Sequence, residues 1–241
     1  MSELDDPVVV EFPLRGEGWM AVTTPAARIP SHGVDILGQR YAFDFVKVDD
    51  RPGVHVHPAS TFTASTVGGR TDECYAWNAQ IHAPFDAEVV AASDGVRERR
   101  WINPFREVAR MVWNGITFRP DRIPAILGNH VILRSGDVYA GFAHLRPGSV
   151  RMRVGDRVAA GDVLGNVGHT GNSTSPHLHF QLMDSADLMN AKGVACAFAA
   201  YDVQADDGSW TRVARGIPGS RERIRSIDDD TAAGAGGSSA A

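Results

Sequence analysis

The chain has 241 residues and a mass of 25.9 kDa, enough for one large domain or two small ones with a buried core. Its 29 acidic and 24 basic side chains give a net charge of −5, which argues against nucleic acid as a partner. No apolar run approaches the roughly 18 residues of a membrane span. The acidic start also lacks the basic and apolar regions of a signal peptide. We therefore expect a cytoplasmic protein as encoded, without a membrane span.

The two ends of the chain differ in composition from its middle. The first thirty residues combine short apolar runs with four prolines, and we expect residues 1–30 to form an arm packed on the domain. Residues 228–241 hold a charge run followed by small residues (DDDTAAGAGGSSAA), a composition that buries no apolar surface. We expect a disordered tail there, which leaves residues 31–227 as one domain.

Short strands broken by Gly, Pro, Asn and Asp are the main signal between residues 31 and 183. An alternating strand is predicted over 41–46, a strand over 83–90 before a Ser-Asp-Gly turn, and a hairpin from 130–134 and 138–145. Three brief apolar segments follow over 150–167, and a last strand over 177–183. The best helical candidate is 106–113. These patterns predict a mostly β fold, more typical of a two-sheet antiparallel sandwich than of a closed barrel.

Four histidines and one aspartate stand out by their arrangement. His177 and His179 occupy alternate positions of one predicted strand, so both side chains share a face about 7 Å apart. His144 comes near the end of another strand. His32 is followed twelve residues later by Asp44, whose carboxylate lies among aromatic residues and is costly to bury without a partner. Two histidines and one aspartate with an open fourth position suit a hydrolytic zinc site.

The chain resembles the lysostaphin-type (LytM-like) zinc metalloendopeptidases over residues 31–183. The resemblance rests on VGDRVAAGDVLG (154–165) and VGHTGNSTSPHLHF (167–180), preceded by Gly-Asn-His-Val at 128–131 and Ala-His-Leu at 143–145. The stretch APFDAEVVA (83–91), with Asp-Gly-Val at 94–96, resembles the first repeat of that family. The resemblance implies a sandwich of the duplicated hybrid-motif type, here with inserted segments at 46–82 and 97–127 that would shape the substrate groove.

The first metal motif departs from the usual family pattern, His-x-x-x-Asp. The stretch from His32 to Asp35 is one residue short of it, and this spacing would put the two groups on opposite faces of a strand. Relatives with a longer insertion carry Ser-His, a variable loop, and then Tyr-Ala-x-Asp-Phe. Residues 31–32 and 41–45 fit that version, so the resemblance assigns the carboxylate ligand to Asp44, with Asp35 as the runner-up.

By resemblance, one zinc ion per chain would be held by His32, Asp44 and His179 together with water, and His177 and His144 would act on that water as catalytic residues. The expected reaction is hydrolysis of a peptide bond, in bacterial cell-wall peptide or a similar peptidoglycan-type substrate. Since that substrate lies outside the membrane, action on it would need another export route. We expect a monomer.

Two alternatives compete with this interpretation. The first is a non-catalytic, degenerate member that acts as a binding or regulatory module. The second is a phosphohistidine carrier with two facing histidines such as His144 and His177, which would leave Asp44 and His179 without a role.

Overall fold

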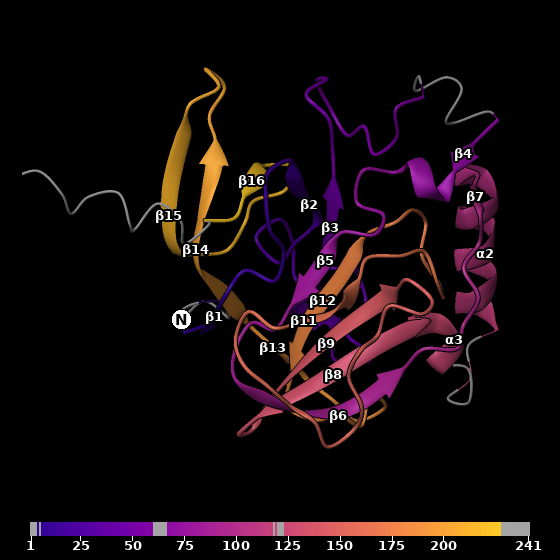
Figure 1. Ribbon diagram of the computed structural model, residues 1–241, viewed down its shortest axis with the longest axis vertical. Coiled ribbons are helices and arrows are strands. Elements are labelled where there is room, and N and C mark those ends of the chain that lie inside the picture. Colours follow the sequence, from indigo (N-terminus) through magenta and orange to yellow (C-terminus); the bar gives the residue numbers. More distant parts are fainter. Residues whose placement is uncertain (1–3, 5, 60–66, 118, 120–122, 228–241) are drawn as a thin grey trace, which may run out of the picture.

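The computed structural model describes residues 4, 6–59, 67–117, 119 and 123–227, and within them the fold is mostly β (Figure 1). This confirms the predicted class. The α-helices are α2 (Pro104–Ile116) and α3 (Ile123–Leu127), and short 3-10 turns occupy Gln39–Tyr41 and Thr71–Glu73. Of the helices described, none has the length and apolar character to cross a membrane. The tail predicted at 228–241 lies outside the described residues.

One long sheet forms the body of the molecule. Twelve described strands belong to it, in the order β1-β14-β16-β2-β3-β12-β9-β8-β6-β10, with β13 paired to β12 and β15 paired to β14. The pairs are antiparallel except for β1 and β14, which run parallel. Strands from both ends of the chain therefore meet in the same sheet.

The strands of this sheet have the following bounds: β1 (Val8–Val10), β2 (Trp19–Thr23), β3 (Phe43–Lys47), β6 (Ala87–Ser93), β8 (Asn129–Ser135), β9 (Val138–Leu145), β10 (Arg157–Val158), β12 (Leu178–Met183), β13 (Gly193–Val194), β14 (Cys196–Gln204), β15 (Trp210–Gly216) and β16 (Arg223–Arg225). Two smaller sheets pair β4 (Gly69–Arg70) with β7 (Trp101–Ile102), and β5 (Gln80–His82) with β11 (Val163–Asn166).

The N-terminal segment, expected to be an arm on the domain, contributes two strands to the main sheet. Strand β1 pairs with β14, and β2 lies between β16 and β3. Phe12, Leu14 and Trp19 are almost completely buried in the main core. The burial of these large side chains ties residues 8–23 to the strands at the C-terminal end of the chain.

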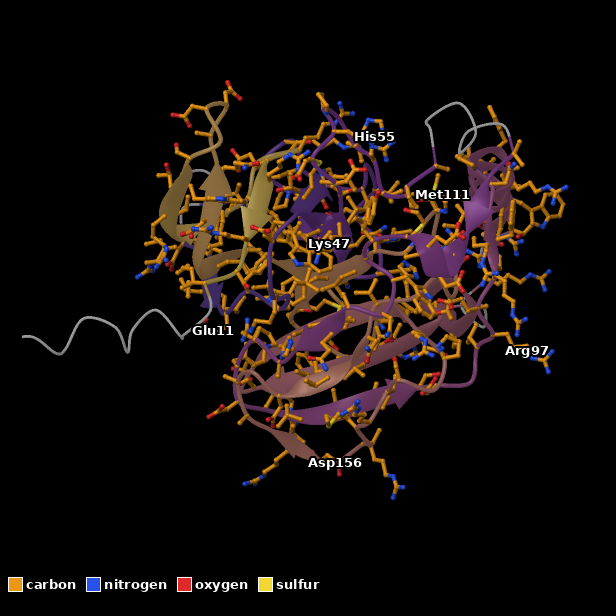
Figure 2. All side chains as sticks on the ribbon, turned by 45° about the horizontal axis from the view of Figure 1, so that its top comes forward. Glu11, Lys47, His55, Arg97, Met111 and Asp156 are labelled. Carbon is orange, nitrogen blue, oxygen red and sulfur yellow. The ribbon has the colours of Figure 1, made fainter. Side chains whose placement is uncertain are left out.

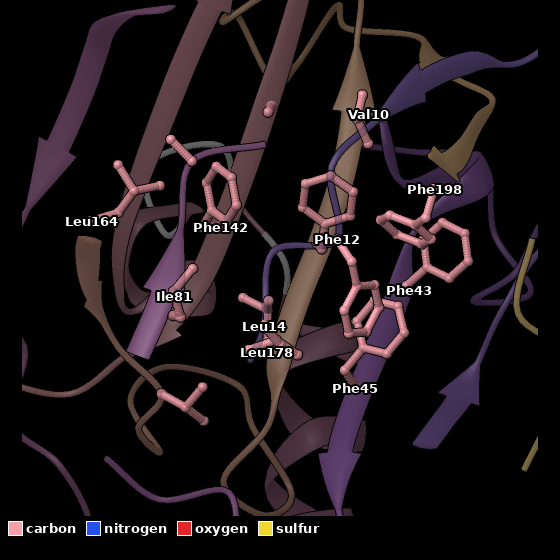
Figure 3. Packing of buried hydrophobic residues seen from close by; sticks show 14 of the residues in the cluster. Val10, Phe12, Leu14, Phe43, Phe45, Ile81, Phe142, Leu164, Leu178 and Phe198 are labelled. Carbon is pink, nitrogen blue, oxygen red and sulfur yellow. The ribbon is translucent and has the colours of Figure 1, made fainter. Parts of the chain in front are cut away.

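A second, much shorter layer covers part of the main sheet. Ile81 of β5 and Leu164 of β11 belong to the same buried cluster as Phe142 of β9 (Figure 3). The fold therefore has two unequal layers.

Further along the same core, Phe43 and Phe45 stack with ring centroids 5.4 Å apart, and both contact Phe198 of β14. This aromatic cluster supports β3 from behind, on the face opposite Asp44.

Helix α2 is longer than the predicted 106–113 and stands at the edge of the molecule beside β7 (Figure 1). Its start follows from capping chemistry. The side chain of Asn103 accepts a hydrogen bond from the backbone N–H of Arg106, and Pro104 occupies the first turn, where its missing N–H costs nothing.

The predicted β8–β9 hairpin is confirmed, and Gly136 takes the left-handed conformation that its turn requires.

Candidate metal centre

Strand pairing brings Asp44 and His179 together. Strands β3 and β12 are antiparallel neighbours, and their register places His179 directly opposite Asp44. Residues opposite one another in such a pair project from the same face. The Oδ1 atom of Asp44 lies 2.9 Å from Nδ1 of His179, while the flanking Phe43 and Phe180 enter the core on the other face.

His32 reaches the same point from the loop before β3. Its Nε2 lies 2.9 Å from Oδ2 of Asp44, and its ring is 5.0 Å from the ring of His179, centroid to centroid. One ligand atom from each of His32, Asp44 and His179 lies within 4.8 Å of the other two. Asp35 is placed elsewhere: its carboxylate is half exposed and pairs with Arg40 at 2.6 Å.

The second ring nitrogen of each of these histidines also has a partner. Nδ1 of His32 lies 3.1 Å from the Ser31 hydroxyl, which also bonds the backbone carbonyl of Gln39. Nε2 of His179 lies 2.8 Å from Oε1 of Gln181. Such partners fix the ring orientation and leave the other nitrogen as the electron-pair donor, which is the usual support of a metal-binding histidine.

His177 and His144 lie beside the cluster with a common orientation. The Nδ1–H of His177 donates to the Ser175 carbonyl at 2.7 Å, and that of His144 donates to the Thr170 carbonyl at 3.0 Å. A carbonyl only accepts, so in each ring Nε2 is the nitrogen that can exchange a proton. The two rings are 4.8 Å apart between centroids, and Nε2 of His177 is 3.5 Å from Oδ1 of Asp44.

A bulge in β9 directs His144 toward this site. Val131 pairs with Phe142 and Asn129 with Leu145, so β9 carries one residue more than β8 across this stretch. His144 adopts a positive φ of 68°, which is uncommon for a residue with a side chain. The extra residue lets Leu145 enter the core while His144 contacts the His177 ring.

The protonation states follow from burial and neighbouring charges. Burial raises the pKa of Asp44, but the charges of His32 and His177 and the hydrogen bonds from His177 and His179 outweigh it and hold this pKa well below its usual range. Burial, reinforced by the nearby His177 and His179, lowers the pKa of His144 well below its usual range. Burial also lowers the pKa of His179, but the bond and charge of Asp44 raise it overall. Asp44 is therefore ionised and His144 neutral near pH 7.

Arg99, from the inserted segment 97–127, holds the loop that carries the Nδ1 partners of His177. Its guanidinium donates to the backbone carbonyls of Gly171 and Ser173, both at 2.8 Å, and pairs with Glu107 of α2. The Ser173 hydroxyl lies 3.2 Å from Nδ1 of His177. The inserted segment is thus bonded directly to the loop that orients a predicted catalytic residue.

Two cavities meet at the cluster. One, of about 310 Å³, is lined mainly by aliphatic side chains of β3 and of the two inserted segments. The other, of about 440 Å³, is lined by all four site histidines. The two cavities share Asp44, Thr174 and His177 in their walls. Helix α2 contributes Val108 to the first cavity and Met111 to the second. A groove therefore crosses the cluster with α2 along one side.

The described residues thus bring all five predicted site residues into one cluster. Gln181 and Arg99 were not predicted. Gln181 continues the alternation of His177 and His179 along β12, so its place on the same face was readable from the sequence. Arg99 carries no such signal, because its partners are backbone carbonyls 72 and 74 residues away.

The donor set fits a zinc ion. Two imidazole nitrogens and one carboxylate oxygen are the ligands that zinc takes in several hydrolytic sites. Ligand atoms about 2.0–2.2 Å from a tetrahedral ion lie about 3.3 Å from one another. The Asp44 oxygens lie 2.9 Å from His32 and from His179, and the three ligand atoms lie within 4.8 Å of one another. Small side-chain movements would accommodate the ion, and Ser31 and Gln181 already support the two histidines.

Part of the chain matches the model of a known protein family. Residues 75–191, just under half of the chain, match the model of peptidase family M23, which confirms the resemblance drawn from the sequence motifs. His144, His177 and His179 fall inside the matched segment, whereas His32 and Asp44 precede it.

Two relatives match parts of the chain. The glycyl-glycine endopeptidase ALE-1 of Staphylococcus capitis is 41% identical over 59 residues, which cover 24% of this chain and 16% of the relative. The peptidoglycan DD-endopeptidase ShyC of Vibrio cholerae is 30% identical over 113 residues, which cover 46% of this chain and 21% of the relative. The chain thus spans only a small part of each relative's length.

Solved structures also superpose on the chain. The catalytic domain of lysostaphin from Staphylococcus simulans aligns with a TM-score of 0.30 and 22% identity, over 52% of this chain and 79% of that domain. A zinc-containing peptidase from Vibrio cholerae aligns with a TM-score of 0.34 and 16% identity, over 78% of this chain and 37% of that one.

Proposed function

We propose that this chain, which carries a peptidase family M23 match over residues 75–191, is a zinc-dependent endopeptidase. The observation that supports this most directly is the convergence of His32, Asp44 and His179 within 4.8 Å, next to His144 and His177. The family match and the endopeptidase names of the two relatives support a hydrolase. The zinc dependence and the roles of the five residues are our proposal.

Zinc in such a site supplies Lewis acidity, which polarises a carbonyl and increases the acidity of water. The side chains of His32, Asp44 and His179 would hold it, and the Asp44 carboxylate is ionised as a ligand must be. No covalent intermediate on the protein is required.

His144 and His177 would handle the protons. In each ring the Nδ1–H donates a hydrogen bond to a backbone carbonyl, which leaves Nε2 unprotonated. Nε2 can therefore take a proton from the attacking water and deliver it to the leaving amine. His144 is neutral near pH 7 and therefore ready to accept. Once one of the two rings has taken the proton from water, its Nε2–H can donate a hydrogen bond to the oxyanion that develops as the carbonyl is attacked.

We further propose a substrate of the peptidoglycan type. This follows the names of the two relatives, one a glycyl-glycine endopeptidase and the other a peptidoglycan endopeptidase. The two cavities share Asp44, Thr174 and His177 in their walls, so a peptide bound across both would pass the cluster. The inserted segments that line it would select the bond.

The test begins with protein purified without chelator. Zinc content is measured by mass spectrometry of the metal, and the protein is then incubated with purified cross-linked peptidoglycan, whose soluble products are identified by mass spectrometry. We expect one zinc per chain and products of peptide-bond cleavage. A folded protein that takes up no added zinc would contradict the proposal. Zinc without products from any peptidoglycan would favour the non-catalytic alternative.

Gln181→Met is expected to weaken zinc affinity about 10- to 100-fold, because Nε2 of His179 then loses the acceptor that orients its ring. The dissociation constant is measured by competition with a fluorescent zinc chelator. Gln80→Met, a matched change at an exposed position of β5, is expected to leave the affinity unchanged. Equal affinities in the two variants would mean that Gln181 gives no support to the metal.

A further inference from the structure

Helix α2 presents its apolar side chains to solvent. The exposed fractions are 71% for Phe105, 52% for Val112, 64% for Trp113 and 76% for Ile116. Positions separated by seven, eight and eleven residues lie along one side of a helix. These four side chains therefore form a continuous apolar stripe on the outer face of α2.

The side of α2 that faces the molecule carries polar contacts as well as Val108 and Met111, which line the two cavities. Glu107 is 4% exposed and pairs with Arg99, and Asn114 donates to Oδ1 of Asn172 at 2.9 Å. A surface helix ordinarily turns its apolar face to the core and its polar face to water. In α2 the four side chains of the stripe lie on the solvent side, so core packing does not account for them.

Exposed apolar residues at the neighbouring two-stranded sheet of β4 and β7 add to the stripe. Trp101 of β7 is 49% exposed, Val67 is 62% exposed, and the Trp101 indole N–H donates to the Val67 carbonyl at 3.1 Å. Strand β7 lies directly beside α2 (Figure 1). We call these six residues the α2 surface: Val67, Trp101, Phe105, Val112, Trp113 and Ile116. Contiguous exposed apolar surface of this kind typically marks a site of interaction with a partner or a membrane.

The charge around the α2 surface is strongly positive. The described residues 97–117 and 119 contain six arginines and two acidic residues, a net charge of +4 in a chain whose total is −5. In the part of the chain that the structure describes, no carboxylate lies within 4.0 Å of the guanidinium groups of Arg97, Arg106 or Arg119. Arg97 extends outward from the body of the molecule, on the same side as Met111 of α2 (Figure 2).

We infer that the α2 surface binds the surface of an anionic lipid bilayer. Exposed Trp, Phe and Ile on one face of a helix, flanked by arginines, are what an interfacial helix uses: the apolar side chains enter the headgroup region and the cations contact lipid phosphates. The charge also argues against a second copy of this chain, because a symmetric pair would bring two segments of net charge +4 together. Binding of this kind is peripheral and requires no membrane span.

The inference is tested by co-sedimentation of the full chain with vesicles. We expect the protein to sediment with phosphatidylcholine vesicles containing about 30% phosphatidylglycerol, and to stay in solution with phosphatidylcholine alone. Phe105→Ser/Trp113→Ser and Arg97→Glu/Arg106→Glu are each expected to lower the partition coefficient at least about tenfold. The matched controls Val154→Ser, at a 65% exposed position, and Arg153→Glu lie near Asp156, far from α2 (Figure 2), and are expected to bind as the wild type does.

Tryptophan fluorescence gives a second readout on the same samples. Anionic vesicles are expected to shift the emission to the blue, with the shift reduced in Trp113→Phe and retained in Trp210→Phe, whose indole lies on β15. Circular dichroism verifies that each variant is folded. A folded wild type that does not sediment with anionic vesicles at low salt would overturn the inference. So would a dimer that Phe105→Ser/Trp113→Ser dissociates, since the α2 surface would then belong to a second copy.

Discussion

Replacing Asp44 by alanine is expected to reduce bound zinc from one ion per chain to almost none, and to abolish peptide hydrolysis with it. The two carboxylate oxygens lie 2.9 Å from His32 and from His179, so this side chain links both histidines. Hydrolytic zinc sites use three protein ligands, and two histidines alone hold the ion much more weakly. Metal mass spectrometry and turnover on the same samples measure both effects.

Asp35→Ala is the matched control. Its carboxylate is half exposed and pairs with Arg40 outside the cluster, so the variant is expected to keep both zinc and turnover. His179→Ala is expected to behave as Asp44→Ala does. Retention of zinc in Asp44→Ala together with its loss in Asp35→Ala would transfer the carboxylate ligand to Asp35. It would also contradict the arrangement of the loop before β3.

His177→Ala is expected to keep zinc and to lose turnover by about 10²- to 10⁴-fold, the usual contribution of a positioned general acid or base. The loss should fall on kcat rather than on KM, because the ring would act on the reacting atoms and its Nδ1 is already bonded to the Ser175 carbonyl. Zinc content, kcat and KM are compared in one preparation.

His130→Ala serves as the control for this variant. His130 lies on β8 with its Nδ1 bonded to the Gly128 carbonyl, and it contributes no atom to the three-residue cluster. Its removal should leave zinc and kcat close to those of the wild type. If His177→Ala lost zinc, the ring would be a ligand; if its turnover were unchanged, His177 would have no part in the reaction.

The inserted segments link the two proposals. Arg99 and Glu107 tie α2 to the loop beside His177, and Val108 and Met111 of the same helix line the groove. The outer face of α2 forms the proposed membrane-binding surface. One helix would therefore both shape the groove and orient it relative to a bilayer.

Local patterns in the sequence were sufficient for the fold class and for several elements. Alternation along the strand predicted at 177–183 placed His177 and His179 on one face, because neighbouring side chains of a strand point in opposite directions. In the structure Leu178 and Phe180 enter the core on the other face. The hairpin of β8 and β9 followed from its turn residues. The same alternation extended by two residues would have included Gln181.

Sequence patterns did not predict the structure where the chain has no hydrophobic periodicity or where a strand is irregular. No strand was predicted after residue 183, whereas the structure has β14, β15 and β16 there, with β1 paired to β14 and β2 to β16 from the other end of the chain. The direction of the His144 side chain depends on one extra residue in β9, and a bulge is defined only relative to the strand it pairs with.

The sequence by itself therefore determined which residue types were available for a metal, and that His177 and His179 share one face of a strand. The tertiary structure decided that His32 and Asp44, which precede the segment matched to family M23, meet His179 from inside it. It also decided that α2 turns its apolar side outward. The physical reason is the same in each case: side-chain direction follows from local backbone geometry, whereas proximity between residues 135 positions apart depends on the register of paired strands and on the packing of the core behind them.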